Sequence, residues 1–327
     1  MNISTPIIGA GSPIVDLLVQ VNDAFIDEID GEKGGMELVP AAVLEAILTK
    51  SGVTPETAAG GSAGNTLFAL ARLGAAASFL GQIGDDADGR LYSDEFAALG
   101  GQTDKFIISS AAHTARCLSL ITPDSERTMR TDLGAAALLS PDAVTPETFA
   151  GIGHAHLEGY MLFAGDLLQK VVSCAKTAGC TISLDLASFE VVRACKSMLP
   201  ELLENYVDIV FANEDEAAEF CGELPVEEQV AELNKYCKLA VVKLGAEGCC
   251  IGEAGKTVRV PAQLATAIDT TGAGDFWQAG FLFGLANGKS LEECGRYGAI
   301  LGAEVVQVIG ASLTDERWQE IKKEVRG

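Results

Sequence analysis

The chain has 327 residues, of which 48% are hydrophobic and 21% charged, so it can bury a large core and is not globally disordered. Its 23 Lys and Arg stand against 46 Asp and Glu, and the formal net charge of −23 repels nucleic-acid backbones and anionic membrane surfaces. Any anion that binds here must be held locally, by a few basic side chains, backbone N–H groups or a metal ion.

Cysteine usage and the N-terminus indicate a cytoplasmic protein. The nine cysteines are scattered and contain no C-x-x-C pair, which argues against a disulfide framework and for a reducing compartment. The first basic residue is Lys33, so the charged region of a signal peptide is missing. No apolar run approaches the roughly 18 residues that span a bilayer. We therefore expect neither a membrane nor a nucleic acid as partner.

In the first 132 residues, the predicted elements are strands with two helices between them. Residues 6–8 and 14–21 are typical of strands, and residues 60–74 repeat apolar side chains with helical spacing up to Gly74. A strand at 77–83 and a helix ending near Leu99 follow. Three strand-like pieces follow without intervening helices, at 105–109, 115–122 and 127–132. Together with 13–40, they predict a small antiparallel sheet.

From about residue 140, strands and helices alternate. Such alternation with short connections predicts a parallel sheet covered by helices on both faces. The predicted strands are 154–157, 180–186, 207–211 and 239–244. The predicted helices are 166–178, 189–205, 273–287, 291–308 and 314–325, and further helices are predicted within 214–237. The sequence therefore predicts one large α/β domain with a small β insertion in its N-terminal third.

The segment 269–275, Asp-Thr-Thr-Gly-Ala-Gly-Asp, carries the strongest chemical signal. Small residues that open a helix leave backbone N–H groups free to approach an anion, and the helix dipole adds to this attraction. A carboxylate at Asp275 would lie beside that anion, where it could take a proton from an attacking hydroxyl. The alternative is a glycine-rich loop that enters a buried helix with an Asp near its start.

Five motifs in order give the chain a family resemblance. They are residues 60–65, 81–86, 213–216, 245–248 and 269–275. With them the chain resembles the ribokinase-like (PfkB) kinases, which transfer a phosphoryl group from ATP to a hydroxymethyl group. The resemblance implies a ribokinase-like α/β sandwich, with a mostly parallel central sheet flanked by helices and a small β-sheet lid. The large domain would comprise 1–12, 52–103 and 133–327, and the lid 13–51 and 104–132.

The resemblance also assigns catalytic roles. Asp275 would be the base, and the N–H groups of Gly272, Ala273 and Gly274 would form the anion hole. In the lid segment, Arg127 would approach the transferring phosphoryl group, with Arg130 as the second candidate. The alternative for this arginine is an exposed hairpin position.

ATP and Mg²⁺ are the implied cofactors. Asn213 and Glu216 match an N-x-x-E signature that organises Mg²⁺ and phosphate, and they would equally form a helix capping box. Gly245 and Gly248 belong to the nucleotide-binding motif. Lys243 departs from the Thr or Ser common in relatives, and a lysine there could itself reach a phosphate.

The acceptor site would lie between the lid and the strand ends. Asp16 would accept hydrogen bonds from vicinal hydroxyls, and the same site would include Ser12, Gly60, Gly61, Ser62 and Asn65. The N-terminal segment resembles adenosine kinases most, and in these an aromatic ring like that of Tyr160 lies against the purine. For Tyr160, packing on the core is the alternative.

Asp269 and Thr271 match positions where relatives bind a monovalent cation such as K⁺. The sequence thus predicts an ATP-dependent kinase for the primary hydroxyl of an adenosine-like nucleoside. A fructokinase- or ribokinase-type sugar kinase is the alternative, followed by a non-catalytic nucleoside- or sugar-binding relative. Monomer and homodimer both remain open.

Overall fold

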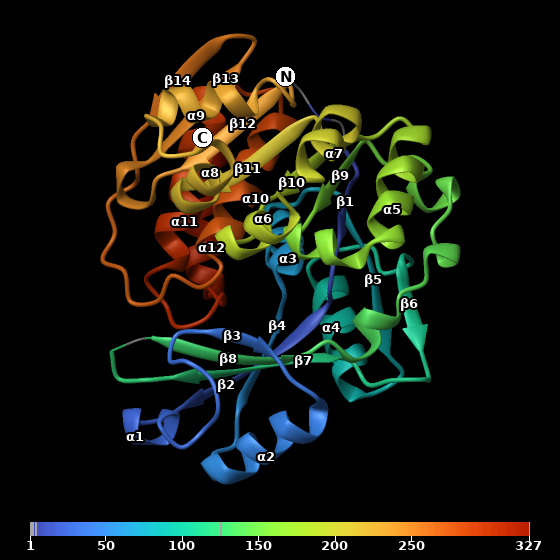
Figure 1. Cartoon of the computed structure of the whole chain (residues 1–327), viewed down its shortest axis with the longest axis vertical. Coiled ribbons are helices and arrows are strands. Elements are labelled where there is room, and N and C mark those ends of the chain that lie inside the picture. Colours follow the sequence, from blue (N-terminus) through green and yellow to red (C-terminus); the bar gives the residue numbers. More distant parts are fainter. Residues whose placement is uncertain (1–2, 4, 125, 327) are drawn as a thin grey trace.

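The computed structural model describes residues 3, 5–124 and 126–326; residues 1, 2, 4, 125 and 327, which the expected domain ranges include, lie outside it. Within the described part, the larger unit is built on a nine-stranded sheet (Figure 1). From β6 to β12 neighbouring strands run parallel, and β13 and β14 complete one edge as antiparallel strands. The spatial order is β14 (Lys256–Val260), β13 (Cys249–Glu253), β12 (Leu239–Lys243), β11 (Ile209–Asn213), β10 (Thr181–Asp185), β9 (His154–Leu157), β1 (Ile7–Ala10), β5 (Ala77–Gly84) and β6 (Phe106–Ser109).

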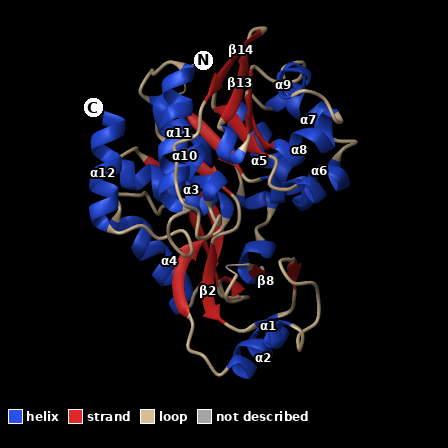
Figure 2. Ribbon diagram, turned by 90° about the vertical axis from the view of Figure 1, so that its left-hand side faces the viewer, coloured by secondary structure: helices blue, strands red, loops and turns tan. Residues whose placement is uncertain are grey.

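Side-chain alternation along the strands gives the large sheet two apolar cores, one on each face. On β11, Phe211 packs with one set of helices, whereas Val210 packs with the other. Figure 2 shows these helices on both sides of the sheet. The Phe211 face is covered by α3 (Ser62–Leu73), α10 (Ala273–Ala286), α11 (Leu291–Val305) and α12 (Asp315–Arg326), and the Val210 face by α5 (Asp166–Thr177), α6 (Phe189–Cys195), α7 (Leu199–Tyr206), α8 (Glu214–Cys221) and α9 (Val226–Leu233).

The smaller sheet lies at one end of the large unit (Figure 1). In the described residues its order is β3 (Met36–Leu38), β8 (Arg127–Asp132), β7 (Ala115–Ile121), β2 (Ile14–Gln20) and β4 (Glu56–Gly60). We call these strands, together with α1 (Asp23–Ile26) and α2 (Ala41–Ser51), the lid. On one face of this sheet, Leu44 of α2 packs with Val15 and Leu118. The alternate residues, such as Asp16, point from the other face toward the large unit.

The predicted architecture is confirmed, but one predicted strand lies in the other sheet from the one expected. Strand β6, predicted within the small sheet, pairs in parallel with β5 of the large sheet. It follows α4 (Ala87–Ala98), and strand–helix–strand units of this kind place both strands side by side in one sheet. Residues 52–103 were expected in the large domain, but within them the unpredicted strand β4 pairs with β2 of the lid. The lid sheet is also mixed, since β2–β7 and β3–β8 are parallel pairs.

One long predicted helix is divided, and the segment predicted to hold several helices contains two. The 189–205 segment breaks into α6 and α7, with Pro200 in the first turn of α7, because proline cannot continue a preceding helix. The 214–237 segment breaks into α8 and α9 at the left-handed Gly222 and at Pro225. The strands β3, β4, β13 and β14 were not predicted.

The topology brings several polar side chains to one edge of the large sheet. The strands β10, β11 and β12 end at Asp185, Asn213 and Lys243. Because the three strands run parallel, their carboxyl ends lie side by side, and we call this side of the sheet the carboxyl edge. In α/β sheets, ligands bind outside the carboxyl ends of the strands. Among the described residues, no helix combines the length and the apolar character needed to cross a membrane.

Candidate active site

The turn that opens α10 has the backbone shape of an anion-binding site. Gly272 is the N-cap in a left-handed conformation (φ +69°), which glycine adopts at no steric cost. The N–H of Ala273 donates to the Thr270 carbonyl at 3.1 Å. Of the three N–H groups expected in the anion hole, the Ala273 group is therefore already used, which leaves those of Gly272 and Gly274 as the candidates.

Asp275 lies in the first turn of α10, partly exposed, and is held by α3. Its Oδ1 accepts a hydrogen bond from Ser62 Oγ, and its Oδ2 accepts one from Asn65 Nδ2, both at 2.9 Å. Thr66 Oγ1 donates to the Asp275 carbonyl oxygen at 3.1 Å. The structure thus brings together Ser62, Asn65 and Asp275, which sequence motifs more than 200 residues apart had assigned to one site.

Burial raises the pKa of Asp275 to about 7, and the nearby Asp185 carboxylate acts in the same direction. The hydrogen bonds from Asn65 and Ser62 and the Lys243 ammonium oppose this rise. A carboxylate with such a pKa can accept and release a proton near neutral pH, as a general base must.

Lys243 lies on the large-domain side of the same turn. Its Nζ is 3.2 Å from Asp185 Oδ1, and both side chains are almost fully buried. Gln278 Nε2 donates to the same Asp185 oxygen at 2.6 Å. Sequence reasoning missed Asp185 and Gln278; the only available sign was that Asp185 ends a predicted strand at the carboxyl edge.

Asn213 and Glu216 form the capping box that was the structural alternative. The Glu216 N–H donates to Asn213 Oδ1, and the Asn213 N–H donates to Glu216 Oε2, both at 2.8 Å. Burial and the Asp185 carboxylate raise the pKa of Glu216 to about 7, while Lys243 lowers it. Glu216 keeps its second carboxylate oxygen for another contact.

Gly245 and Gly248 form the turn after β12, and both are left-handed (φ +51° and +93°). A Cβ on Gly248 would lie 2.0 Å from the Val260 carbonyl oxygen, so this glycine is required by packing. A Cβ on Gly245 would meet open space, so only its conformation favours glycine.

The described residues contain no group of three or more His, Cys, Asp or Glu that could hold a metal ion. The Oε1 atom of Glu216, which the capping box does not use, would suit a Mg²⁺ ion that arrives on the phosphates of a nucleotide, because Mg²⁺ commonly keeps several waters.

Asp16 extends from the lid face that points toward the large unit. A Cβ on Gly60 would lie 2.3 Å from Asp16 Oδ2, so the carboxylate occupies the space that glycine leaves open. Gly61 (φ +85°) also lies close to other backbone atoms, since a Cβ on it would be only 2.5 Å from the Ser12 carbonyl oxygen. Burial raises the pKa of Asp16 to about 6, and the Arg127 guanidinium opposes this rise.

Arg127 and Arg130 lie on opposite faces of β8, as their odd spacing requires. Arg127 reaches the loop before α10, where it donates to Thr271 Oγ1, and it also donates to Ser119 Oγ. Arg130 is fully buried inside the lid and donates to the carbonyl oxygens of Asp30 and Met129. The structure therefore removes Arg130 as the second candidate.

Asp269 and Thr271 lie together as the cation-site hypothesis requires, but hydrogen bonds already occupy them. Asp269 Oδ1 accepts from the N–H and Oγ1 of Thr271, and its Oδ2 accepts from the Gly310 N–H at 2.8 Å. The Arg127 guanidinium is 3.9 Å from the same carboxylate. Monovalent cation binding stays a prediction.

Glu158 is a buried acid next to the expected acceptor site that sequence reasoning missed. It accepts hydrogen bonds from the N–H groups of Ser12 (2.8 Å) and Ala63 (3.2 Å), and so ties two of the glycine-rich segments together. Burial raises its pKa to about 7. Tyr160, two residues later, is 39% exposed, and burial together with the Glu158, Asp185 and Asp275 carboxylates raises the pKa of its hydroxyl.

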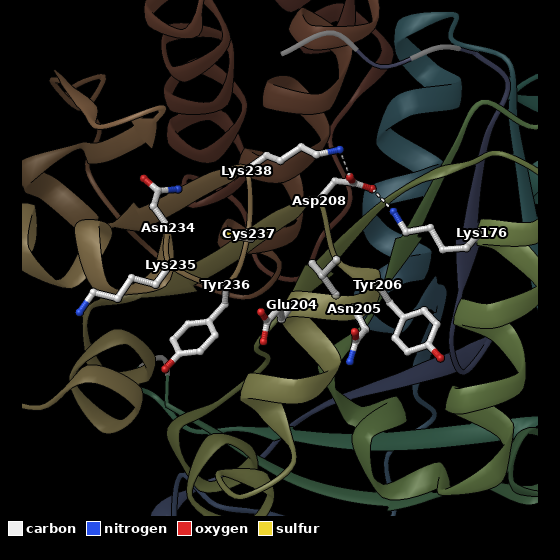
Figure 3. A pocket seen from close by; sticks show the side chains of 11 residues that line it. Lys176, Glu204, Asn205, Tyr206, Asp208, Asn234, Lys235, Tyr236, Cys237 and Lys238 are labelled. Atoms are coloured by element: carbon white, nitrogen blue, oxygen red, sulfur yellow. Dashed lines mark hydrogen bonds and ion pairs between the residues drawn. The ribbon is translucent and has the colours of Figure 1, made fainter.

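A cavity of about 360 Å³ lies at the opposite ends of the strands of the large sheet (Figure 3). It surrounds Asp208, which precedes β11 and binds Lys176 and Lys238. It lies at the amino ends of the strands, away from Asp275, so it does not belong to this site.

Comparison with known proteins gives this geometry a family. The description "pfkB family carbohydrate kinase" matches residues 39–318. The crystal structure of adenosine kinase from Sinorhizobium meliloti is 32% identical, covers 99% of this chain and 100% of its own, and has a TM-score of 0.88. A structure described as a probable sugar kinase protein from Rhizobium etli is 30% identical, with 99% of each chain covered and a TM-score of 0.88.

A ribokinase from Arabidopsis thaliana is 28% identical over 277 residues, which are 80% of this chain and 71% of that protein. The family match covers well over half of the chain, and the sandwich with its small second sheet is the ribokinase-like fold. The chain therefore belongs to the pfkB family of carbohydrate kinases and is an ATP-dependent phosphotransferase with an alcohol group as acceptor.

Proposed function

We propose that the protein phosphorylates the primary hydroxyl of a nucleoside, adenosine or a close analogue, at the expense of ATP. The S. meliloti adenosine kinase supports this choice, since it is similar to the chain over its whole length. The composition of the lid face opposite the strand ends supports it as well.

One row of paired residues across the lid carries the proposal. Leu38 pairs with Thr131, Thr131 with Cys117, and Cys117 with Asp16, so these four side chains share the face that points toward the large unit. Leu38 is 63% exposed there, and Met36 of the neighbouring row is 41% exposed. A nucleoside matches this face, because its sugar hydroxyls would bind Asp16 while its planar base would cover the apolar side chains.

The proposed chemistry is an in-line transfer with Asp275 as base. Asp275 takes the proton of the acceptor hydroxyl, whose oxygen forms a bond to the γ-phosphorus while the bond from that phosphorus to the bridging oxygen breaks and ADP leaves. The N–H groups of Gly272 and Gly274 stabilise the charge on the transferring group, and Arg127 does so from the lid. Ser62 and Asn65 orient the base.

ATP would lie along the carboxyl edge, beside Asn213, Glu216, Lys243, Gly245 and Gly248. Mg²⁺, bound mainly through phosphates and water, would neutralise phosphate charge. Asp16, Gly60, Gly61 and Ser12 would bind the acceptor sugar, with Tyr160 near the base.

A sugar kinase is the second candidate, and the R. etli and A. thaliana relatives favour it by their names. A pentose or hexose would bind Asp16 equally well but would leave Leu38 and Met36 uncovered. The two candidates therefore differ in what contacts β3.

The test is ATP consumption with a panel of adenosine, other nucleosides, ribose and fructose. We expect the highest kcat/KM with adenosine. Leu38→Asn should raise the KM for adenosine about tenfold, as loss of roughly 1.4 kcal/mol of apolar contact predicts, and Val43→Asn on α2, also an exposed aliphatic, should not. A higher kcat/KM with ribose or fructose, together with an unaffected Leu38→Asn variant, would favour the sugar kinase.

A further inference from the structure

The ammonium of Lys243 is placed against the turn that binds the transferring group. Lys243 is the last residue of β12, and its side chain is only 13% exposed. Its Nζ lies 3.1 Å from the point where a Cβ on Gly274 would stand. The positive charge is therefore adjacent to the backbone of the first turn of α10, on the side of the large domain.

Two buried groups hold this ammonium in place. Asp185 Oδ1 accepts from Lys243 Nζ at 3.2 Å and from Gln278 Nε2 at 2.6 Å. Gln278 is fully buried and lies three residues after Asp275, so it projects from nearly the same side of α10 as the base. The amide fixes the carboxylate, and the carboxylate in turn limits where the lysine can point.

The surroundings keep Lys243 charged. Burial alone would lower its pKa, but the carboxylates of Asp185, Glu216 and Asp275 outweigh burial and raise it. An acidic site of this kind repels a phosphoryl group unless a local positive charge offsets the carboxylates. On the lid side Arg127 supplies such a charge, and on the large-domain side Lys243 does.

We propose that Lys243 contacts the transferring phosphoryl group directly, as a fixed positive charge of the anion-binding turn, and that Asp185 and Gln278 are its positioning residues. This inference rests on the proposed kinase function and deepens it. An ammonium at this position has an interaction that strengthens as charge builds on the transferring oxygens.

The test compares Lys243→Met with the wild type and with Lys176→Met. Lys176, whose side chain is 32% exposed, pairs with the buried Asp208 at the opposite ends of the strands, so its loss controls for removal of an ammonium from a buried carboxylate. Lys243→Met should lower kcat by about 10² to 10³, the range for a lost transition-state donor, while the KM values for ATP and adenosine change less than about threefold. Lys176→Met should leave kcat unchanged.

A binding measurement separates this role from a structural one. Lys243→Met should bind Mg·ADP like the wild type but should lose at least about tenfold in affinity for Mg·ADP with aluminium fluoride and adenosine, which mimics the transferring group. Asp185→Asn should lower kcat in the wild type and have almost no further effect in the Lys243→Met background, because it acts through the lysine. Lys243→Met alone leaves the buried Asp185 carboxylate without its partner, which could prevent folding. The double variant Asp185→Asn with Lys243→Met removes both charges together and so still allows the test.

The outcomes distinguish this inference from the proposed function. A Lys243→Met protein with kcat and aluminium fluoride affinity close to those of an active wild type would overturn the role of Lys243 alone. Additive effects of Asp185→Asn and Lys243→Met would overturn the positioning role of Asp185. A wild type that consumes no ATP with adenosine, ribose or fructose would instead contradict the kinase function on which both rest.

Discussion

At the scale of single residues, the environment of Asp275 sets the pH at which it can act as a base. Burial raises its pKa to about 7, and the hydrogen bonds from Asn65 and Ser62 hold it below the value that burial alone would give. A base must be deprotonated to accept a proton. We therefore expect kcat/KM to rise with pH through about 7.

Asn65→Ala tests this balance. It removes a donor that stabilises the ionised carboxylate, so the pKa of Asp275 should rise and the acidic limb of the pH profile should move to higher pH.

Asp275→Asn, which cannot accept the proton, should lower kcat by about 10² to 10⁴ while ATP binding persists. A near-wild-type kcat in Asp275→Asn would remove the mechanism, whatever the pH profile of Asn65→Ala.

Arg127 and Arg130 offer a matched pair on one strand. Arg127 faces the loop before α10, whereas Arg130 donates to backbone carbonyls inside the lid. Arg127→Met should therefore lower kcat, whereas Arg130→Met should lower the unfolding temperature by removing a fully buried charge that holds backbone carbonyls of the lid, and should change kcat less. Turnover assays and thermal unfolding of both variants check this assignment. An unchanged kcat in a folded Arg127→Met protein would contradict it.

The motifs placed Ser62, Asn65 and Asp275 in one site, because each belongs to a short local pattern. They could not separate Arg127 from Arg130, since that distinction depends on which face of β8 turns inward, and the strand phase is set only by pairing with β7. Asp185 and Gln278 carry no local pattern at all. Their role appears only when β10 and α10 are packed together.

At the scale of elements, Asp208 ties three parallel strands together at the amino edge of the sheet (Figure 3). Its carboxylate accepts from the N–H of Ile182 at 2.9 Å and binds the ammonium groups of Lys176 and Lys238. Its carbonyl oxygen accepts from the N–H groups that begin β12. One buried residue thus links the starts of β10, β11 and β12.

Asp208→Asn should therefore destabilise the fold without affecting catalysis. We expect a loss of about 1–3 kcal/mol in the free energy of unfolding, the range for hydrogen bonds to a charged group, and an unchanged kcat. Burial alone would raise the pKa of Asp208, but Lys176 and Lys238 lower it below 3.8, so its contribution is present above that pH and is lost as the pH falls further. Denaturant unfolding should show a smaller difference from wild type near pH 3 than at pH 7, and an equal difference at both would contradict the electrostatic origin.

Strand membership is where the element predictions failed. The 105–109 segment was grouped with the two strands that follow it, because no helix separates them in the sequence. Its partner, however, was decided by the helix before it, since the β5–α4–β6 unit returns the chain to the large sheet. Local pattern identifies a strand, whereas the crossover decides its sheet.

At the scale of the whole molecule, one face of the lid sheet is covered by α2, and the other is covered in part by loops of the large unit. Leu44 and Ile47 of α2 are buried against one face, and the other face meets the loops around Thr271 and Gly310. A partner subunit that paired its lid face to face would have to displace α2 or close the acceptor site. We therefore expect a monomer.

Sedimentation equilibrium over a range of protein concentrations should give a mass of about 34 kDa, that of a single chain. Leu44→Asp should uncover the apolar face beneath α2, so this variant should associate or lose stability. A wild-type mass twice as large would show that another surface pairs, and the exposed Leu38 and Met36 at β3 would be its first candidates. Leu38→Asn would then restore the monomer, and Leu38 would have to be reassigned from the acceptor site to an interface, which ties the oligomeric state to the choice between nucleoside and sugar.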